Sequence, residues 1–489
     1  MKNILKFHKL YILVFFAFSC SDNDDATFIP SATEELVVED FIWKSMNLWY
    51  FWKDSAPNLG DNRFSNNEEY IGFLSSYSNP ITFFQEAIMV TEDKFSYITS
   101  DYNTLFDSQQ GIFTTTGIEY GLYRVGEGYD VVGVVKYILP NSDASGKDVQ
   151  RGDIFYAVNG ENLYSEGEGG DSNLSIIRQE TVTLSFADVV DGTIVPNGVE
   201  IEFVASEYTE NPVHIAKVIE EGSNKIGYLM YNGFTSPFDD ELNQAIGDLK
   251  SQGITDLVVD LRYNPGGSVT TSTYLASMIT GQFNGSLYAR LRYNDFWQDF
   301  FGNERLSYNF TNQIETQYVN EAINSLNLTR VYFITSNRTA SASELLINGL
   351  EPYIDVIQIG NETVGKNQAS ITLLDDPRGD FVSTVPYSGK SREQANPLHT
   401  YALQPIVSRT ENSAGFSEYE EGLVPDILII EDIANLGTLG ETSDPLLARA
   451  VEEITGVASK KLLKKPGVVA EYITDSKMQL PTKNNMYID

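Results

Sequence analysis

The fold class is indicated by one stretch, Leu257-Val258-Val259-Asp260-Leu261-Arg262-Tyr263-Asn264-Pro265-Gly266-Gly267. Its first half is a nearly continuous apolar run, which is typical of a strand covered on both faces of a sheet. Its second half ends the strand, because Pro-Gly-Gly favours a tight turn. Similar strands are predicted at residues 225–231, 331–334 and 355–360, with an amphipathic helix near 242–249. This alternation predicts an α/β layered core over residues 211–440, with crossover helices between the strands.

Two other patterns lie on the N-terminal side of this core. In residues 34–106, apolar and aromatic residues recur at helical spacing from Val38 to Trp49 and predict a helical domain with a buried aromatic stripe. In residues 111–205 the pattern changes to short alternating strands with Gly turns, one of them closed by Asn159-Gly160. The second region is therefore expected to form a separate β module.

The two ends of the chain are expected to lie outside these domains. The N-terminal segment carries Lys2, Lys6 and Lys9, the run Leu10–Phe18 is apolar, and small residues lead up to Cys20. This order predicts a signal peptide over residues 1–19. The place of Cys20 resembles a bacterial lipobox, in which the cysteine becomes the acylated first residue, although an ordinary signal peptide with an incidental cysteine is the alternative. Residues 20–33 are expected to form a tether, and residues 441–489 a helix followed by a frayed end.

Composition and charge exclude several classes of function. The chain has 489 residues, and its 68 acidic and 33 basic residues give a formal net charge of −35. This charge repels nucleic acid and anionic headgroups, so neither is an expected electrostatic partner. One cysteine and three widely spaced histidines, His8, His214 and His399, provide neither a disulfide nor a recognisable zinc pattern. No metal and no cofactor are therefore expected.

Three segments at strand ends of the core carry groups suited to acyl transfer. Residues 338–344 place Ser341 between small residues at a predicted helix start, where backbone N–H groups favour a developing anion. The turn at residues 264–267 exposes N–H groups that can form an oxyanion hole. Lys366, in the loop 360–367, becomes a possible general base if burial lowers the pKa of its amine. Each segment alone also fits a structural role, as a helix N-cap, a strand-ending turn and a solvated loop lysine.

Together, the three segments resemble the C-terminal processing (tail-specific) serine peptidases of the S41 type. The match rests on the runs DLRxNPGG and TASASE and on the pair Gly365-Lys366, which follow one another in the order typical of that family. It spans roughly Glu34 to Asp444 and includes the late segment Gly422–Asp426. The resemblance implies a multidomain α/β protein whose peptidase core has the crotonase/ClpP-like layered architecture.

The resemblance also implies roles for individual residues. Ser341 would be the nucleophile and Lys366 the general base of a Ser–Lys dyad. The oxyanion hole would be formed by the N–H of Ala342 and the N–H of Gly266 or Gly267. Such a dyad needs no imidazole, which agrees with the scarcity of histidine.

Other positions near the dyad are less defined. Glu344 is expected to support the site rather than act as a base, and Ser343 is the alternative nucleophile. Some family members carry Gln shortly after the lysine, at the position where this chain has Ser370. Some carry an acid downstream of the nucleophile, at the position where this chain has Pro352. Ser370 is therefore a second supporting candidate, and the third catalytic residue stays open.

The β module resembles a PDZ domain in the order of its motifs. A strand is followed by Pro-x-Ser-x-Ala at 140–144, then Arg-Gly-Asp at 151–153 and a strand ending in Val-Asn-Gly. A PDZ-like module binds an extended peptide by strand addition, with loop N–H groups holding a C-terminal carboxylate. The candidate loop lies near Thr114–Gly121 and includes Gly117 and Ile118 as peptide-binding residues. The alternative is a β module that only separates two domains.

Two hypotheses of function follow. The first is a lipid-anchored endopeptidase of the cell envelope that acts on polypeptides and recognises exposed C-terminal segments. The second is a non-catalytic envelope protein whose PDZ-like module captures protein tails. The pair Ser341 and Lys366 favours the first, since a binding protein has no use for it. The natural substrate and the oligomeric state stay open.

Overall fold

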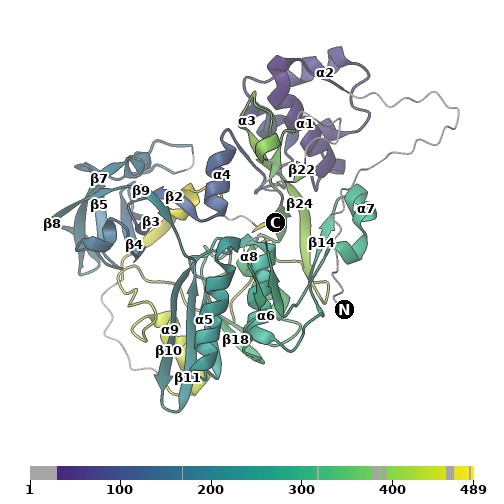
Figure 1. The fold of residues 1–489 in the computed structure, drawn as a ribbon. Helices are drawn as coiled ribbons and strands as arrows, with labels where there is room; N and C mark the ends of the chain where they lie inside the picture. The colour runs from purple at the N-terminus through teal and green to yellow at the C-terminus, as the bar shows by residue number, and fades with distance from the viewer. Residues whose placement is uncertain are drawn as a thin grey trace.

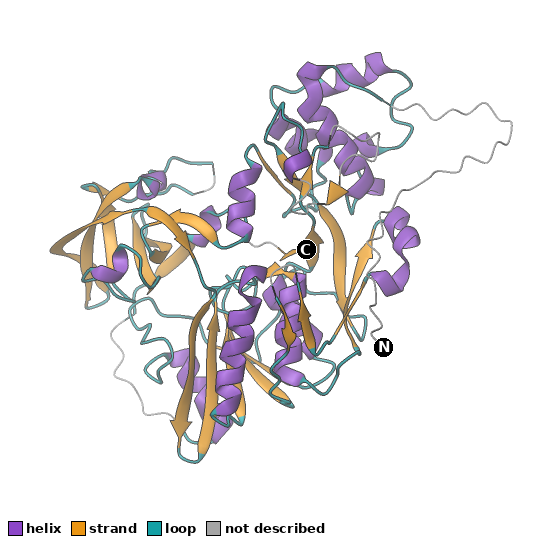
Figure 2. Cartoon of the chain, viewed as in Figure 1, coloured by secondary structure: helices purple, strands orange, loops and turns teal. Residues whose placement is uncertain are grey.

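The computed structural model describes residues 30–167, 169–316, 319–376, 385–386, 392–458, 467–483 and 486–488. Three parts of the chain meet near its C-terminus: a helical domain at the top of Figure 1, a β domain at the left and an α/β core below. Figure 2 shows how strands dominate the β domain and helices the N-terminal domain. Within the described residues, no helix is long and apolar enough to cross a membrane.

The core is built on a six-stranded sheet. Its strands, in spatial order, are β10 (Val213–Glu221), β11 (Asn224–Tyr231), β12 (Asp256–Asp260), β18 (Arg330–Thr335), β19 (Asp355–Gly360) and β25 (Ile427–Leu428). The first two form an antiparallel hairpin, and the others run parallel to β11. The predicted α/β core with a mainly parallel sheet is confirmed.

Helices cover both faces of this sheet, which explains the continuous apolar run in β12. Val259 packs with α5 (Asp239–Ser251), α6 (Val269–Thr280) and α8 (Ala342–Leu350). Its neighbour Val258 points to the opposite face and packs with α9 (Pro445–Thr455). Successive strand residues face opposite sides, so a sheet covered on both sides needs apolar residues at every position.

A second sheet rises from the core toward the helical domain. Its order is β13 (Gly267–Ser268), β27 (Met486–Tyr487), β20 (Gln368–Ser370), β24 (Ile406–Asn412), β14 (Leu287–Tyr293) and β15 (Ser307–Asn309). The aromatic region near residues 282–318, whose sequence pattern does not indicate particular elements, supplies β14, β15 and α7 (Asp295–Arg305). Trp297 of α7 stacks on Trp49 with ring centroids 4.1 Å apart, so this arm packs on the helical domain.

The predicted helical domain is present. It contains α1 (Val37–Trp49), α2 (Asn67–Leu74), α3 (Pro80–Thr82), the π-helical turn η4 (Phe83–Ile88) and α4 (Tyr102–Gln109). Ile42 and Met46 of α1 are fully buried, as the helical spacing predicts. The short strand β1 (Tyr97–Thr99) joins this domain to the core by pairing with β23 (Ala402–Gln404).

The β domain is one antiparallel sheet with a buried apolar side. It contains β3 (Ile118–Val125), β4 (Val131–Ile138), β5 (Ile154–Val158), β7 (Thr181–Val190) and β8 (Thr193–Val204). The two-stranded ribbon of β2 (Ile112–Thr115) and β9 (Ser206–Thr209) leads into and out of it.

The prediction of a frayed C-terminal end is wrong, because residues there form strands. After α9, residues 470–475 form β26, which is added to the outer edge of β3, and residues 486–487 form β27 inside the second sheet. Ile473 packs on the core of the β domain and Met486 is fully buried, and this burial orders the segment.

Candidate active site

Ser341 occupies a strained turn between β18 and α8. Its φ of 69° and ψ of −116° lie in a region that side-chain-bearing residues rarely adopt. The residue has no exposed surface, and its Oγ has no hydrogen-bond partner within the described part of the chain. Ala342 is the first residue of α8, so its N–H lies at the helix N-terminus beside that hydroxyl. Strain of this kind is common where a structure holds a reactive side chain in place.

Lys366 lies in the loop between β19 and β20 and is 1% exposed. Burial disfavours its ammonium form and lowers the pKa of Lys366 to about 7, although the charges of Asp93 and Glu344 act in the opposite direction. The Nζ atom lies 5.1 Å from the ring centroid of Phe95. Asp93 and Phe95 both belong to the N-terminal domain, so that domain forms part of the lysine's surroundings.

Glu344 ties the serine turn to the lysine loop. Its Oε2 accepts the N–H of Ser341 at 2.6 Å and the N–H of Lys366 at 2.9 Å. Its Oε1 accepts the N–H of Gly365 at 2.6 Å and the hydroxyl of Thr363. Burial raises the pKa of Glu344, while these four hydrogen bonds stabilise the carboxylate. The predicted supporting residue therefore lies where it can fix the distance between the two loops.

The glycine turn, residues 264–267, has a tightly constrained backbone. A Cβ added to Gly267 would lie 2.2 Å from the carbonyl oxygen of Phe234, and its φ is 138°, so this position needs glycine. The N–H of Gly266 already donates to Asn264 Oδ1 at 2.9 Å. Of the two alternatives for the oxyanion hole, Gly266 thus has its N–H engaged within the turn, and Gly267 is the ladder partner of Met486 in β27.

Asn264 also joins the glycine turn to the serine turn. Its carbonyl oxygen accepts the N–H of Ala340 and the hydroxyl of Ser343, both at 3.2 Å. The hydroxyl of Ser343, the alternative nucleophile, is thus engaged in a structural hydrogen bond. The structure brings Ser341, Lys366 and the glycine turn together through Glu344 and Asn264.

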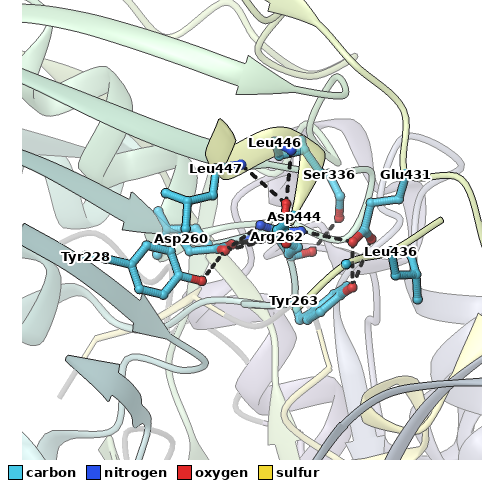
Figure 3. Close-up of polar contacts among 12 residues, drawn as sticks. Tyr228, Asp260, Arg262, Tyr263, Ser336, Glu431, Leu436, Asp444, Leu446 and Leu447 are labelled. Atoms are coloured by element: carbon cyan, nitrogen blue, oxygen red, sulfur yellow. Dashed lines mark hydrogen bonds and ion pairs between the residues drawn. The ribbon is translucent and has the colours of Figure 1, made fainter. Parts of the chain in front are cut away.

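A buried charge cluster, drawn in Figure 3, is centred on Arg262, just before the glycine turn in the sequence. Arg262 has no exposed surface and donates to Asp260 from Nε at 2.9 Å and from Nη2 at 2.7 Å. Its Nη1 donates to Asp444 at 2.7 Å and to Glu431 at 3.0 Å. Asp260 also accepts the hydroxyl of Tyr228 at 2.7 Å, and Asp444 caps α9. These bonds fix the end of β12, from which the glycine turn projects.

The same cluster reaches the β domain through Arg151. Its guanidinium donates to Glu431 and to the hydroxyl of Tyr263, both at 2.8 Å. Burial alone would raise the pKa of Glu431, but Arg151 and Arg262 hold it at about 2. Sequence reasoning missed Glu431 and Asp444, because both lie far from Arg262 along the chain. The Asp444-Pro445 pair signals only a helix start.

The remaining predicted site residues make contacts of other kinds. Ser370 donates its hydroxyl to the carbonyl of Met486 at 3.2 Å and so contacts the C-terminal segment. The N–H of Gly117 donates to Thr115 Oγ1 at 3.0 Å, and Ile118 is buried in the β domain. Cys20 lies outside the described residues.

Two family models match the chain. The model for peptidase family S41 covers residues 225–403, which hold nearly all of β11, the strands β12, β18 and β19, and both loops of the site. The model for the peptidase S41 N-terminal domain covers residues 38–97 of the helical domain.

Individual relatives agree with these matches. The chloroplastic carboxyl-terminal-processing peptidase 3 of Arabidopsis thaliana is 24% identical over 296 residues, which are 56% of this chain and 53% of that protein. The carboxyl-terminal-processing protease of a Picosynechococcus strain is 22% identical over 72% of this chain and 73% of its own length. A crystal structure of a putative S41 protease from Bacteroides fragilis is 25% identical, covers 86% of this chain and 98% of its own, and superposes with a TM-score of 0.65. The chain thus spans about half the length of the Arabidopsis relative and nearly all of the Bacteroides one.

The two family models place the matched parts of the chain, residues 38–97 and 225–403, in peptidase family S41. Carboxyl-terminal-processing proteases are among the relatives of the chain.

Proposed function

We propose that this protein is a serine endopeptidase that hydrolyses polypeptides with a Ser341–Lys366 dyad. The neutral amine of Lys366 accepts the proton of Ser341 Oγ as this oxygen attacks the substrate carbonyl. The N–H groups of Ala342 and of Gly266 or Gly267 stabilise the oxyanion. Lys366 then gives the proton to the leaving amine, and a water molecule hydrolyses the acyl-enzyme by the same route.

One observation carries this proposal. A buried lysine with a pKa near 7 is joined to a strained, buried serine by a single carboxylate, Glu344. Half of such lysine side chains are neutral at pH 7, which is the form that a general base requires. A non-catalytic binding protein gains nothing from a buried neutral amine and a strained serine whose loops are held by one carboxylate.

Substrate recognition and location extend the proposal. The β domain, with its PDZ-like order of motifs, is proposed to bind extended polypeptide segments by strand addition. Cys20 is proposed to carry the lipid that anchors the protein at the cell envelope.

Cleavage of an unstructured protein tests the dyad. The chain from residue 21 onward is incubated with such a protein beside its Ser341→Ala, Lys366→Ala and Ser343→Ala variants, and fragments are followed by mass spectrometry. Loss of cleavage in the first two variants and its survival in the third are expected. Cleavage that persists in folded Ser341→Ala would contradict the proposal.

The anchor is tested separately in cells that make the full chain. Cys20→Ala is expected to abolish both membrane sedimentation and labelling by a fatty-acid probe. A variant that still takes up the label overturns the lipid anchor and leaves the dyad unaffected.

A further inference from the structure

The C-terminal strap, defined here as residues 470–483 and 486–488, has its first part on the β domain and its last part in the catalytic core. We propose that the outer edge of β3 is the edge that binds polypeptide segments, and that the strap is its resident ligand, which a substrate must displace. This inference rests on the proposed peptidase function and adds the kind of substrate and the regulation of the same site.

The first part of the strap binds β3 as an added strand. β26 pairs with β3 in antiparallel register, with Ala470 opposite Val125 and Asp475 opposite Gly121. Just beyond β26, the N–H of Ser476 donates to the carbonyl of Tyr120 at 3.1 Å. The N–H of Tyr120 in turn donates to Ser476 Oγ at 3.1 Å. Main-chain pairing to an open edge is the general mode of peptide recognition by strand addition.

The contacts that the side chains of β26 make with the β domain indicate which residues a ligand of this edge would carry. Ile473 is half-buried and packs against the apolar core of the β domain, which includes Ile118 and Leu122 of β3. Glu471, which directly faces Arg124 in the register, forms an ion pair with it at 2.8 Å. A ligand of this edge is therefore an extended segment with a branched apolar residue at the position of Ile473. An acidic residue two positions earlier would match Arg124.

The strap then continues into the catalytic core. Asp475 accepts Arg338 Nε at 2.7 Å, just before the serine turn. Lys477 is held by Glu210 and by the carbonyl of Asn232, so the strap is anchored on its way.

Its last part lies beside the proposed catalytic groups. β27 is inserted between β13 and β20, with Met486 opposite Gly267 and Tyr487 opposite Ser370. The N–H of Ile488 donates to the carbonyl of Ser370 at 3.0 Å. The strap thus occupies the edge of β3 at one end and the edge of the glycine turn at the other.

This arrangement describes a closed state. Ser341 is 0% exposed and Lys366 1% exposed, so a polypeptide cannot reach them without a rearrangement. A segment tethered in the same chain competes at millimolar effective concentration, and the apparent affinity for a free ligand falls accordingly. A substrate whose tail pairs with β3 displaces β26, which frees the strap to withdraw from the glycine turn.

A reversible crosslink tests the proposal. Arg124→Cys combined with Glu471→Cys, in the chain from residue 21 onward, supplies two directly opposed cysteines and no others. The probe is a fluorescent peptide with the sequence Glu-Tyr-Ile-Thr-Asp-Ser, and its binding is measured by anisotropy on the Ser341→Ala background. Oxidation is expected to weaken probe binding at least ~10-fold, and reduction to restore it. Arg124→Cys with Glu471→Ser is the control and should not respond to oxidant.

A second variant opens the strap instead of closing it. Ile473→Asp places a charge against the apolar core of the β domain, and we expect it to raise probe affinity by ~10-fold or more and to raise kcat/KM for protein substrates. Equal probe binding in the oxidised and reduced double-cysteine protein would show that β26 is a permanent strand. A disulfide that does not form would contradict the pairing of β26 with β3. Binding does not depend on catalysis. Normal strap competition without cleavage by any variant would therefore contradict only the peptidase proposal.

Discussion

Asp475 at the end of β26 holds the guanidinium of Arg338 at 2.7 Å, and Arg338 leads directly into the turn that carries Ser341. Burial alone would raise the pKa of Asp475, but Arg338 and Lys136 keep it below its usual range, so the carboxylate is charged. The C-terminal strap and the serine turn are therefore joined by a buried ion pair. A change in the position of β26 is transmitted to the turn through this contact.

Activity should depend on the ionisation of Lys366. Since its pKa is about 7 and the neutral amine is the base, kcat/KM is expected to rise with pH through about 7 and to level off above about 8. A rate profile against pH, measured on a peptide substrate without ionisable groups in this range, checks the expectation. Activity that falls with rising pH through 7 would contradict a lysine base.

The same lysine should destabilise the fold at neutral pH. Its folded pKa of about 7 lies below the unfolded value of 10.5, so the unfolded chain binds more protons between these limits. Lys366→Met is therefore expected to be more stable than the natural protein near pH 7, by a few kcal/mol at most, and the difference should shrink as pH rises toward about 10. Urea unfolding at several pH values measures it.

Asp93 should set the position of that pH profile. Its charge favours the ammonium form of Lys366, so Asp93→Asn is expected to lower the pKa of Lys366 and shift the rise in activity to lower pH. Asn keeps an oxygen that can accept the N–H groups of Phe95 and Ser96. Asp101→Asn, at the exposed N-cap of α4, is the matched control and should leave the profile in place.

Glu344 should be needed as a carboxylate. Glu344→Gln replaces one acceptor oxygen by a donor that opposes backbone N–H groups now bound at 2.6 to 2.9 Å. We expect a loss of at least ~10-fold in kcat/KM and a stability loss of about 1–3 kcal/mol. Glu351→Gln, at the exposed C-terminal end of α8, should change neither. An active Glu344→Gln enzyme would reduce Glu344 to a helix-start residue.

The strain at Ser341 predicts a difference between two inactive variants. Glycine adopts φ of 69° and ψ of −116° without the penalty that a Cβ brings, so Ser341→Gly should be more stable than Ser341→Ala by about 1–3 kcal/mol. Equilibrium unfolding of the two proteins gives the value directly. If alanine proves the more stable, the turn is relaxed in solution.

The buried cluster around Arg262 should be sensitive to loss of its cation. Arg262→Met leaves the carboxylates of Asp260 and Asp444 buried without their partner, which is expected to lower the free energy of unfolding by about 3–5 kcal/mol. Arg449→Met removes a partly exposed ion pair on α9 and should cost no more than about 1 kcal/mol. Equal effects of the two substitutions would contradict the role given to the cluster.

Sequence patterns predicted the core strand and the serine turn, because the residues that determine these elements are close together in the sequence. The run Leu257–Leu261 indicated a doubly covered strand because both of its faces are buried, and small residues around Ser341 indicated a sharp turn. The aromatic region near 282–318 gave no clear local pattern, because its elements are stabilised by distant packing. Trp297 of α7 packs on the N-terminal domain, whereas Tyr288 of β14 packs in the α/β core. Asp93 had no local signal either, since the lysine on which it acts lies in a different domain, much later in the chain.

The strand β26 near the end of the chain could not be predicted for a similar reason. Residues 470–475 contain tyrosine, isoleucine and threonine in a row, which favours a strand, but the partner β3 lies near the beginning of the β domain, far earlier in the chain. A strand whose only described partner is this distant cannot be inferred from spacing, and the polar residues around it suggested a loose end instead.

The pairing of β26 with β3 also protects an otherwise open sheet. Without β26, the outer side of β3 is an unpaired row of N–H and C=O groups, a surface that recruits strands from other molecules. A protein whose strap has been released therefore presents both a free edge and a free complementary strand. At high concentration, two such molecules are expected to exchange straps and form a domain-swapped dimer. Any opening of the strap that admits substrate therefore also makes self-association possible. Size-exclusion chromatography across a concentration series would show this exchange as a dimer fraction that the oxidised double-cysteine protein lacks.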